Sequence, residues 1–294
     1  MMVVIRMKYI ECMVIMMQNS YDGSPTLYLV PTPIGNMGDI TYRAVDVLRE
    51  VEVIFSEDTR VTLNLLKYFD ISKKLIALHD HNEEDLKEKV LEYLKDGKNI
   101  ALVTDRGTPI ISDPGYKTVK YVTDKGFNVV SLPGATAFVP ALTVSGLAPQ
   151  PFLFYGFLNS KESKRKEELE KLSTEEETMI FYEAPHRIKS TLKLMLEVFG
   201  DRNISISREI SKKFESVYRG KISEVIDMVP EKGEFVIVVE GTTNNGNELS
   251  NLSTKDAVDM YIKAGLDVMS AIKRVAKDRG VSKSVIYKEY HSEV

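Results

Sequence analysis

The chain has few of the residues that build disulfide frameworks and metal centres. Cys12 is its only cysteine, which excludes an intramolecular disulfide and a thiolate zinc site. Its four histidines contain no HExxH or similar ligand pair, so we predict no bound transition metal. No apolar run is long enough to span a bilayer. These absences predict a cytoplasmic protein with no metal and no membrane association.

The chain also has no excess of positive charge. The formal net charge is −4, which excludes indiscriminate coating of nucleic acid, because such binding depends on summed phosphate neutralisation. A single local basic face directed at one structured RNA stays compatible with this balance. The motifs GxGxxG, GxxxxGK[ST] and GxSxG are absent, which removes the usual dinucleotide, P-loop and hydrolase interpretations.

The amino-terminal segment is rich in methionine, with six of the twelve methionines in its first 17 residues. Arg6, Lys8 and Glu11 interrupt its apolar run and no small-residue cleavage site follows, so a secretory signal fits poorly. We predict that residues 1–23 form a flexible extension.

The following segment alternates between strand and helix patterns. Short apolar runs typical of strands occur at 27–31, 53–56, 75–78, 100–103 and 127–132. Helical patterns separate them at 40–51, 61–69, 83–94 and 135–145. This alternation predicts an α/β domain with a parallel sheet over residues 24–149.

The proline-rich segment 148–151 marks a predicted boundary. Beyond it, strand patterns at 152–157, 179–182, 204–207, 214–219 and 234–240, some joined by short links, predict a second α/β domain with a mixed sheet over 150–245. A polar stretch at 242–251 opens the predicted linker and helical tail, 246–294, which could form three helices.

The ends of the predicted strands carry the conspicuous motifs PTPIGN, SEDTR, TDRGTP and LPGATA. Ligands of such sheets bind beyond the carboxyl ends of the strands, so this coincidence is the strongest functional signal. Plainer interpretations stay open for individual motifs. PTPIGN is also typical of an ordinary turn, and Asp58 in SEDTR of a helix cap. In the second half, YEAPHR could place a proline at a helix start with His186 and Arg187 merely solvated.

Six segments in order, LYLVPTPIGNMGDIT, SEDTRVTLNLL, LVTDRGTPIISDPGY, SLPGATA, FYEAPHRI and SREISKKFESVYRG, closely resemble the bacterial 16S ribosomal RNA (cytidine-2′-O)-methyltransferases. That family belongs to the tetrapyrrole-methylase-like, class III group. The resemblance covers about residues 25–242. It implies two α/β domains with S-adenosylmethionine in the cleft between them, a homodimer, and small-subunit ribosomal RNA as substrate.

The resemblance also implies the cofactor-binding residues, which are Pro33, Gly107, Thr108, Pro109, Ile111, Thr136, Ala137 and Tyr182. Two positions depart from the pattern of the wider group. Arg106 stands where a small residue is expected, and Ala135 replaces a common proline. A long cation at position 106 could reach solvent or a substrate phosphate.

Methyl transfer to a ribose requires positioning of a hydroxyl group and an acceptor for its proton. Asp58 and Glu183 are the predicted bases, and Arg60, Arg187, Lys212 and Lys213 are the predicted contacts to RNA phosphates. Two alternatives stay open: a small-molecule methylase of the same fold that acts on a tetrapyrrole, and a non-enzymatic, RNA-binding ribosome-assembly protein.

Overall fold

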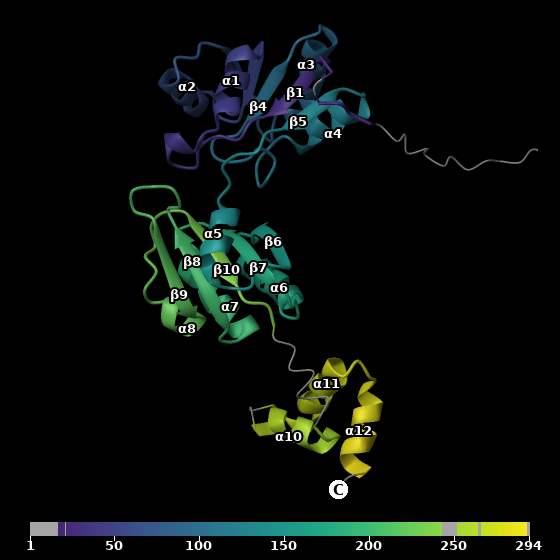
Figure 1. The fold of residues 1–294 in the computed structure, drawn as a ribbon. Helices are drawn as coiled ribbons and strands as arrows, with labels where there is room; N and C mark the ends of the chain where they lie inside the picture. Colours follow the sequence, from purple (N-terminus) through teal and green to yellow (C-terminus); the bar gives the residue numbers. More distant parts are fainter. Residues whose placement is uncertain (1–16, 21, 243–251, 264–265, 293–294) are drawn as a thin grey trace, which may run out of the picture.

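The computed structural model describes residues 17–20, 22–242, 252–263 and 266–292. They form two α/β units, each built on a five-stranded sheet, and a helical tail (Figure 1). The predicted flexible extension lies mostly outside these residues, as does the polar stretch at 242–251, of which only Thr242 is described.

The first sheet is entirely parallel, as predicted, with strand order β3-β2-β4-β1-β5. Its strands are β1 (Thr26–Leu29), β2 (Val53–Ser56), β3 (Lys74–Ala77), β4 (Ile100–Val103) and β5 (Asn128–Ser131). They are short and largely apolar because both faces are covered by helices.

Two helices cover each face of this sheet. One face packs on α1 (Tyr42–Glu50) and α2 (Thr59–Tyr68). The other packs on α3 (Glu83–Lys95) and α4 (Tyr116–Asp124). The loop after β1 also contains the 3-10 turn η1 (Met37–Asp39). Because all five strands are parallel, their carboxyl ends lie along one edge of the sheet, and the loops with the conspicuous motifs follow these ends.

The second sheet is mixed, as predicted, with strand order β6-β7-β10-β8-β9. Its only parallel pair is β6–β7. Its strands are β6 (Phe152–Phe157), β7 (Thr178–Glu183), β8 (Asn203–Arg208), β9 (Ser216–Lys221) and β10 (Phe235–Val239). One face packs on α6 (Glu162–Leu172), α7 (Ile188–Phe199) and α8 (Ile222–Val225).

The opposite face of the second sheet packs on α5 (Phe138–Ser145), whose Ala141 and Leu142 are buried against β7 and β10. Figure 1 shows α5 beside these strands, away from the first sheet. The chain therefore changes core before α5, upstream of the proline-rich segment at 148–151. The helix also starts three residues later than predicted, and residues 136–137 line a cavity instead.

The tail contains α10 (Thr254–Lys263), α11 (Val268–Asp278) and α12 (Lys283–Ser292), in agreement with the predicted helical unit. Ala257, Ile272, Val275 and Ile286 form its own small apolar core. In the described part of the chain, no helix combines the length and the apolar character needed to cross a membrane.

Candidate functional site

A cavity of about 630 Å³ lies between the carboxyl edge of the first sheet and the second sheet. The first domain contributes the loops after β1, β2, β4 and β5. The second domain contributes the end of β7 and the start of β10. This is where an open parallel sheet presents its ligand site.

The loop after β4 forms one wall and is fixed by hydrogen bonds to its neighbours. Thr32 and Gly107 exchange two backbone hydrogen bonds, at 2.9 and 3.0 Å, which join the loops after β1 and β4. Gly107 has a φ of +88°, a left-handed conformation that glycine adopts without steric cost. The Thr108 hydroxyl donates to the carbonyl of Ala135 at 3.0 Å and so ties on the loop after β5.

The same loop contains strained backbone. Ile110 and Ser112 have φ values of +78° and +67°, on either side of Ile111. A β-branched residue in this region is an outlier that the surrounding structure must enforce. Ile111 lines the cavity and its side chain is partly exposed there. The strain thus accompanies the presentation of an apolar side chain to the site.

Residues of both domains meet at the cavity. Thr136 and Ala137 line the cavity from the first domain's last loop, and Tyr182 lines it from β7. Burial raises the pKa of the Tyr182 phenol, while hydrogen bonds from the Thr136 side chain and the Phe138 backbone lower it. Tyr182 therefore lies beside the loop after β5 at the cavity.

Six of the eight predicted cofactor residues therefore line one cavity: Gly107, Thr108, Ile111, Thr136, Ala137 and Tyr182. The other two do not line it. Pro109, in the same loop, is buried, and Pro33 lines a neighbouring cavity.

Three carboxylates of the first domain, Glu57, Asp105 and Asp113, also line the cavity. Glu57 accepts a hydrogen bond from the Thr104 hydroxyl at 2.8 Å. Burial, helped by the negative charges of Glu57, Asp105 and Asp80, raises the pKa of Asp113 to about 6, although a hydrogen bond with Thr104 opposes the rise. Burial also raises the pKa of Asp105. Sequence reasoning missed all three, although SEDTR, TDRGTP and the following SDPG contain them.

Asp58 lies outside this group. It caps α2 by accepting a hydrogen bond from the Arg60 backbone N–H at 2.8 Å, and its carboxylate pairs with the Arg60 guanidinium at 2.6 Å. These hydrogen bonds with Arg60 lower the pKa of Asp58 to about 2. Asp58 does not line the cavity, and an anion of such low basicity is a poor proton acceptor.

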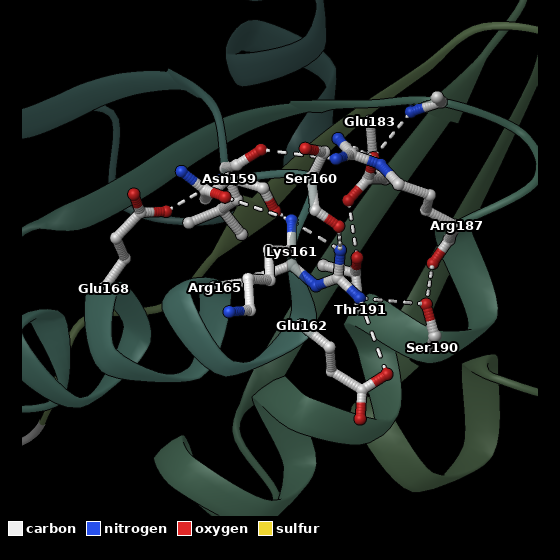
Figure 2. Close-up of polar contacts among 12 residues, drawn as sticks. Asn159, Ser160, Lys161, Glu162, Arg165, Glu168, Glu183, Arg187, Ser190 and Thr191 are labelled. Atoms are coloured by element: carbon white, nitrogen blue, oxygen red, sulfur yellow. Dashed lines mark hydrogen bonds and ion pairs between the residues drawn. The ribbon is translucent and has the colours of Figure 1, made fainter.

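Glu183 contributes to the cavity wall, but its carboxylate is fully buried and engaged by several donors (Figure 2). The Arg187 guanidinium contacts it at 2.6 Å and the Ala184 backbone N–H donates to it at 2.7 Å. The Thr191 hydroxyl donates to its other oxygen. This geometry disfavours Glu183 as a base and leaves little of Arg187 to meet a phosphate.

The predicted phosphate contacts differ in how free they are. The Arg60 side chain is 88% exposed and Lys213 is exposed beside the Phe214 ring. Lys212 is mostly covered and pairs with Glu209 at 3.0 Å and Glu234 at 2.8 Å.

Arg106 also pairs with Glu234, across the cleft. The long cation at this departing position therefore bridges the two domains in the structure. Among the described residues, no three His, Cys, Asp or Glu side chains are grouped so as to hold a metal ion.

The family profile described as Tetrapyrrole (Corrin/Porphyrin) Methylases matches residues 26–226, which contain every wall of the cavity except the start of β10. The chain belongs to this family. Within it, the chain is 48% identical over 285 residues to the Ribosomal RNA small subunit methyltransferase I of Bacillus subtilis, covering 93% of this chain and 98% of that protein. Its counterpart of the same name in Vibrio cholerae is 42% identical over 273 residues, covering 91% and 94%.

Solved tetrapyrrole methylases and related enzymes share the fold. Uroporphyrin-III C-methyltransferase from Thermus thermophilus, complexed with S-adenyl homocysteine, superposes with a TM-score of 0.54 at 19% identity, covering 73% of this chain and 97% of that chain. Diphthine synthase superposes with a TM-score of 0.57 at 14% identity, covering 74% and 90%. At such identities the likeness concerns the fold.

Proposed function

We propose that this protein transfers the methyl group of S-adenosylmethionine to the ribose 2′-hydroxyl of a cytidine in small-subunit ribosomal RNA. The observation that carries the proposal is the cavity itself. It gathers six residues that the family resemblance assigns to the cofactor, in a chain 48% identical to a ribosomal RNA small subunit methyltransferase. We further propose that the protein is a homodimer in the cytoplasm.

The cavity suits the cofactor in size and chemistry. Its volume of about 630 Å³ lies within the usual range for small-molecule sites. Ile34, Ile111 and Val236 offer apolar surface to an adenine ring. Asp105 and Asp113 offer negative charge to a sulfonium cation. The cofactor supplies a methyl group that is already electrophilic.

The protein's own task is then to place the ribose hydroxyl in line with the methyl group, exclude competing water and accept a proton. Arg60 and Lys213, the exposed cations, are the strongest candidates for RNA phosphate contacts. Arg60 must leave the Asp58 carboxylate to meet a phosphate, and the mostly covered Arg187 and Lys212 must leave their own carboxylate partners. With a net charge of −4, affinity must come from shape and few contacts, which favours assembled subunits over short naked RNA.

The decisive test uses small ribosomal subunits from cells that lack this gene. We expect the purified protein to add one ribose methyl group, mapped by nuclease-resistant dinucleotides, and to leave porphyrinoid substrates unmodified. Methylation of a porphyrinoid instead would favour the tetrapyrrole alternative. Absence of S-adenosylhomocysteine binding would favour a non-enzymatic assembly protein. Light scattering of the same preparation measures whether the mass is that of a dimer.

A further inference from the structure

A second cavity, of about 450 Å³, lies beside the first. The loop after β1, the start of α2 and two second-domain residues, Glu209 and Lys212, line it. Gly35 permits this closure, since a Cβ there would overlap the Lys212 side chain. The two cavities share three lining residues, Val61, Asp105 and Arg106.

The walls of the second cavity suit a nucleoside. Pro33, Met37 and Leu65 supply apolar surface against which a base can pack. Arg106 and Lys212 lie on its wall, each paired with Glu234, and a flanking phosphate that displaces this carboxylate can engage them. Its volume lies within the range of small-molecule sites. A single unstacked nucleotide is the RNA element of this size.

We infer that the second cavity takes the target nucleoside of the RNA, and that Asp105 on the shared wall accepts the proton of its 2′-hydroxyl group. The inference rests on the proposed function, which sets a methyl donor in the first cavity. Donor and acceptor must meet where the cavities join, and among the described residues Asp105 is the only carboxylate that lines both.

The step balances with Asp105 as the base. The 2′-oxygen forms a bond to the methyl carbon, and the carbon–sulfur bond breaks with its electron pair left on sulfur. The hydroxyl proton passes to the Asp105 carboxylate. The sulfonium charge is thereby cancelled and the protonated acid is neutral.

The hydrogen bonding of Asp105 leaves it available for this role. Its Oδ1 accepts one hydrogen bond, from the Asp58 backbone N–H at 3.0 Å, and it forms no ion pair among the described residues. Asp58 and Glu183 are both paired with arginine. Asp113 lines the first cavity alone. Burial, which raises the pKa of Asp105, makes its carboxylate a better proton acceptor.

The nucleoside subsite is tested by filling it. Met37 lies in η1 and lines the second cavity only, so Met37→Trp should raise the KM for small subunits about tenfold or more. S-adenosylhomocysteine affinity, measured by calorimetry, should stay unchanged and reports an intact fold. Met228→Trp is the matched control, because Met228 is exposed and lines neither cavity. An unchanged KM in Met37→Trp would overturn the subsite.

The base is tested by Asp105→Asn, which keeps the oxygen that accepts from Asp58. Single-turnover methylation should fall about 10²–10⁴-fold, with S-adenosylhomocysteine affinity retained. Asp80→Asn, an exposed neighbour outside both cavities, should behave like the unmodified protein. A normal rate in Asp105→Asn, or a comparable loss in Asp113→Asn alone, would overturn the assignment. An unmodified protein that binds S-adenosylhomocysteine but methylates no subunits would instead refute the proposed function.

Discussion

The two walls of the cavity handle charge differently. On the first domain's side, Glu57, Asp105 and Asp113 face the cavity without an ion pair to any described residue. On the second domain's side, Glu183 pairs with Arg187, and Glu234 pairs with Lys212 and Arg106. Burial raises the pKa of Asp105 and of Asp113, whereas the paired carboxylates of the second domain hold the shape of the wall. We therefore expect the first domain to supply the catalytic carboxylate and the second domain to hold the cavity in shape.

The largest expected effect comes from blocking the first wall. Thr108→Arg places a long cation in the cavity and removes the hydroxyl that ties Thr108 to Ala135. S-adenosylhomocysteine binding should be abolished while unfolding stays cooperative. Thr174→Arg is the matched control, because Thr174 is exposed and outside the cavity. Unchanged affinity in Thr108→Arg would refute the cofactor wall.

Substitutions on the second domain's side of the cavity should lower the stability of the fold rather than the rate of methylation. Glu183→Ala strands the Arg187 guanidinium in a buried site and should cost about 3–5 kcal/mol of unfolding free energy. Replacing both residues by alanine should recover part of this loss. Glu197→Ala, in the exposed pair with Lys166, should cost about 0–1 kcal/mol. Denaturant unfolding measures all three. A stable Glu183→Ala variant that has lost only methylation would restore Glu183 as the base.

The raised pKa of Asp113 predicts that the stability of the fold depends on pH. Because burial raises its folded-state pKa to about 6, from 3.8 when unfolded, the folded protein binds the proton more tightly. Its contribution to stability is therefore present at low pH and is lost as pH rises from 3.8 through 6. Asp113→Asn should unfold at a higher temperature than the unmodified protein at neutral pH, with the difference vanishing once the pH falls below the unfolded-state pKa. A difference that does not vary with pH would contradict the raised pKa.

RNA binding should depend more on the free cation than on the paired one. Removing Lys212 and Lys213 together should weaken subunit binding by about 1–2 kcal/mol for each lysine that meets a phosphate, and should flatten its salt dependence. Lys213→Ala alone should account for most of the change, since Lys212 is neutralised by Glu209 and Glu234. Filter binding across a salt series measures this. If S-adenosylhomocysteine affinity fell in parallel, the lysines would act at the cofactor cavity and not at the RNA contact.

The strands and the loops that line the cavity were predictable because each is a local pattern, a short apolar run followed by proline, glycine and acids. Helix α4 was not singled out, since its Val119, Val122 and Thr123 are β-branched and weaken a helical signal. Glu183 was predicted as a base because the sequence places a carboxylate at a strand end. Its carboxylate is covered by Arg187 and Thr191, which lie four and eight residues further along the chain, at the start of α7. The partner of Arg106, 128 residues away, has no local signal.

The smallest effect is expected far from the cavity, at the outer edge of the first sheet. Gln18 exchanges two hydrogen bonds with the Val129 backbone in the edge strand β5, both at 2.9 Å. A chain that starts at Ser20 loses both bonds, yet they are exposed and can be replaced by water. Methylation rate and oligomer mass should therefore be unchanged, and the unfolding free energy should fall by less than about 1 kcal/mol. A large loss of rate or mass would mean that the amino-terminal residues support the site or the subunit contact. The edge of the first sheet would then help to hold the cavity in shape, as we expect of the second domain.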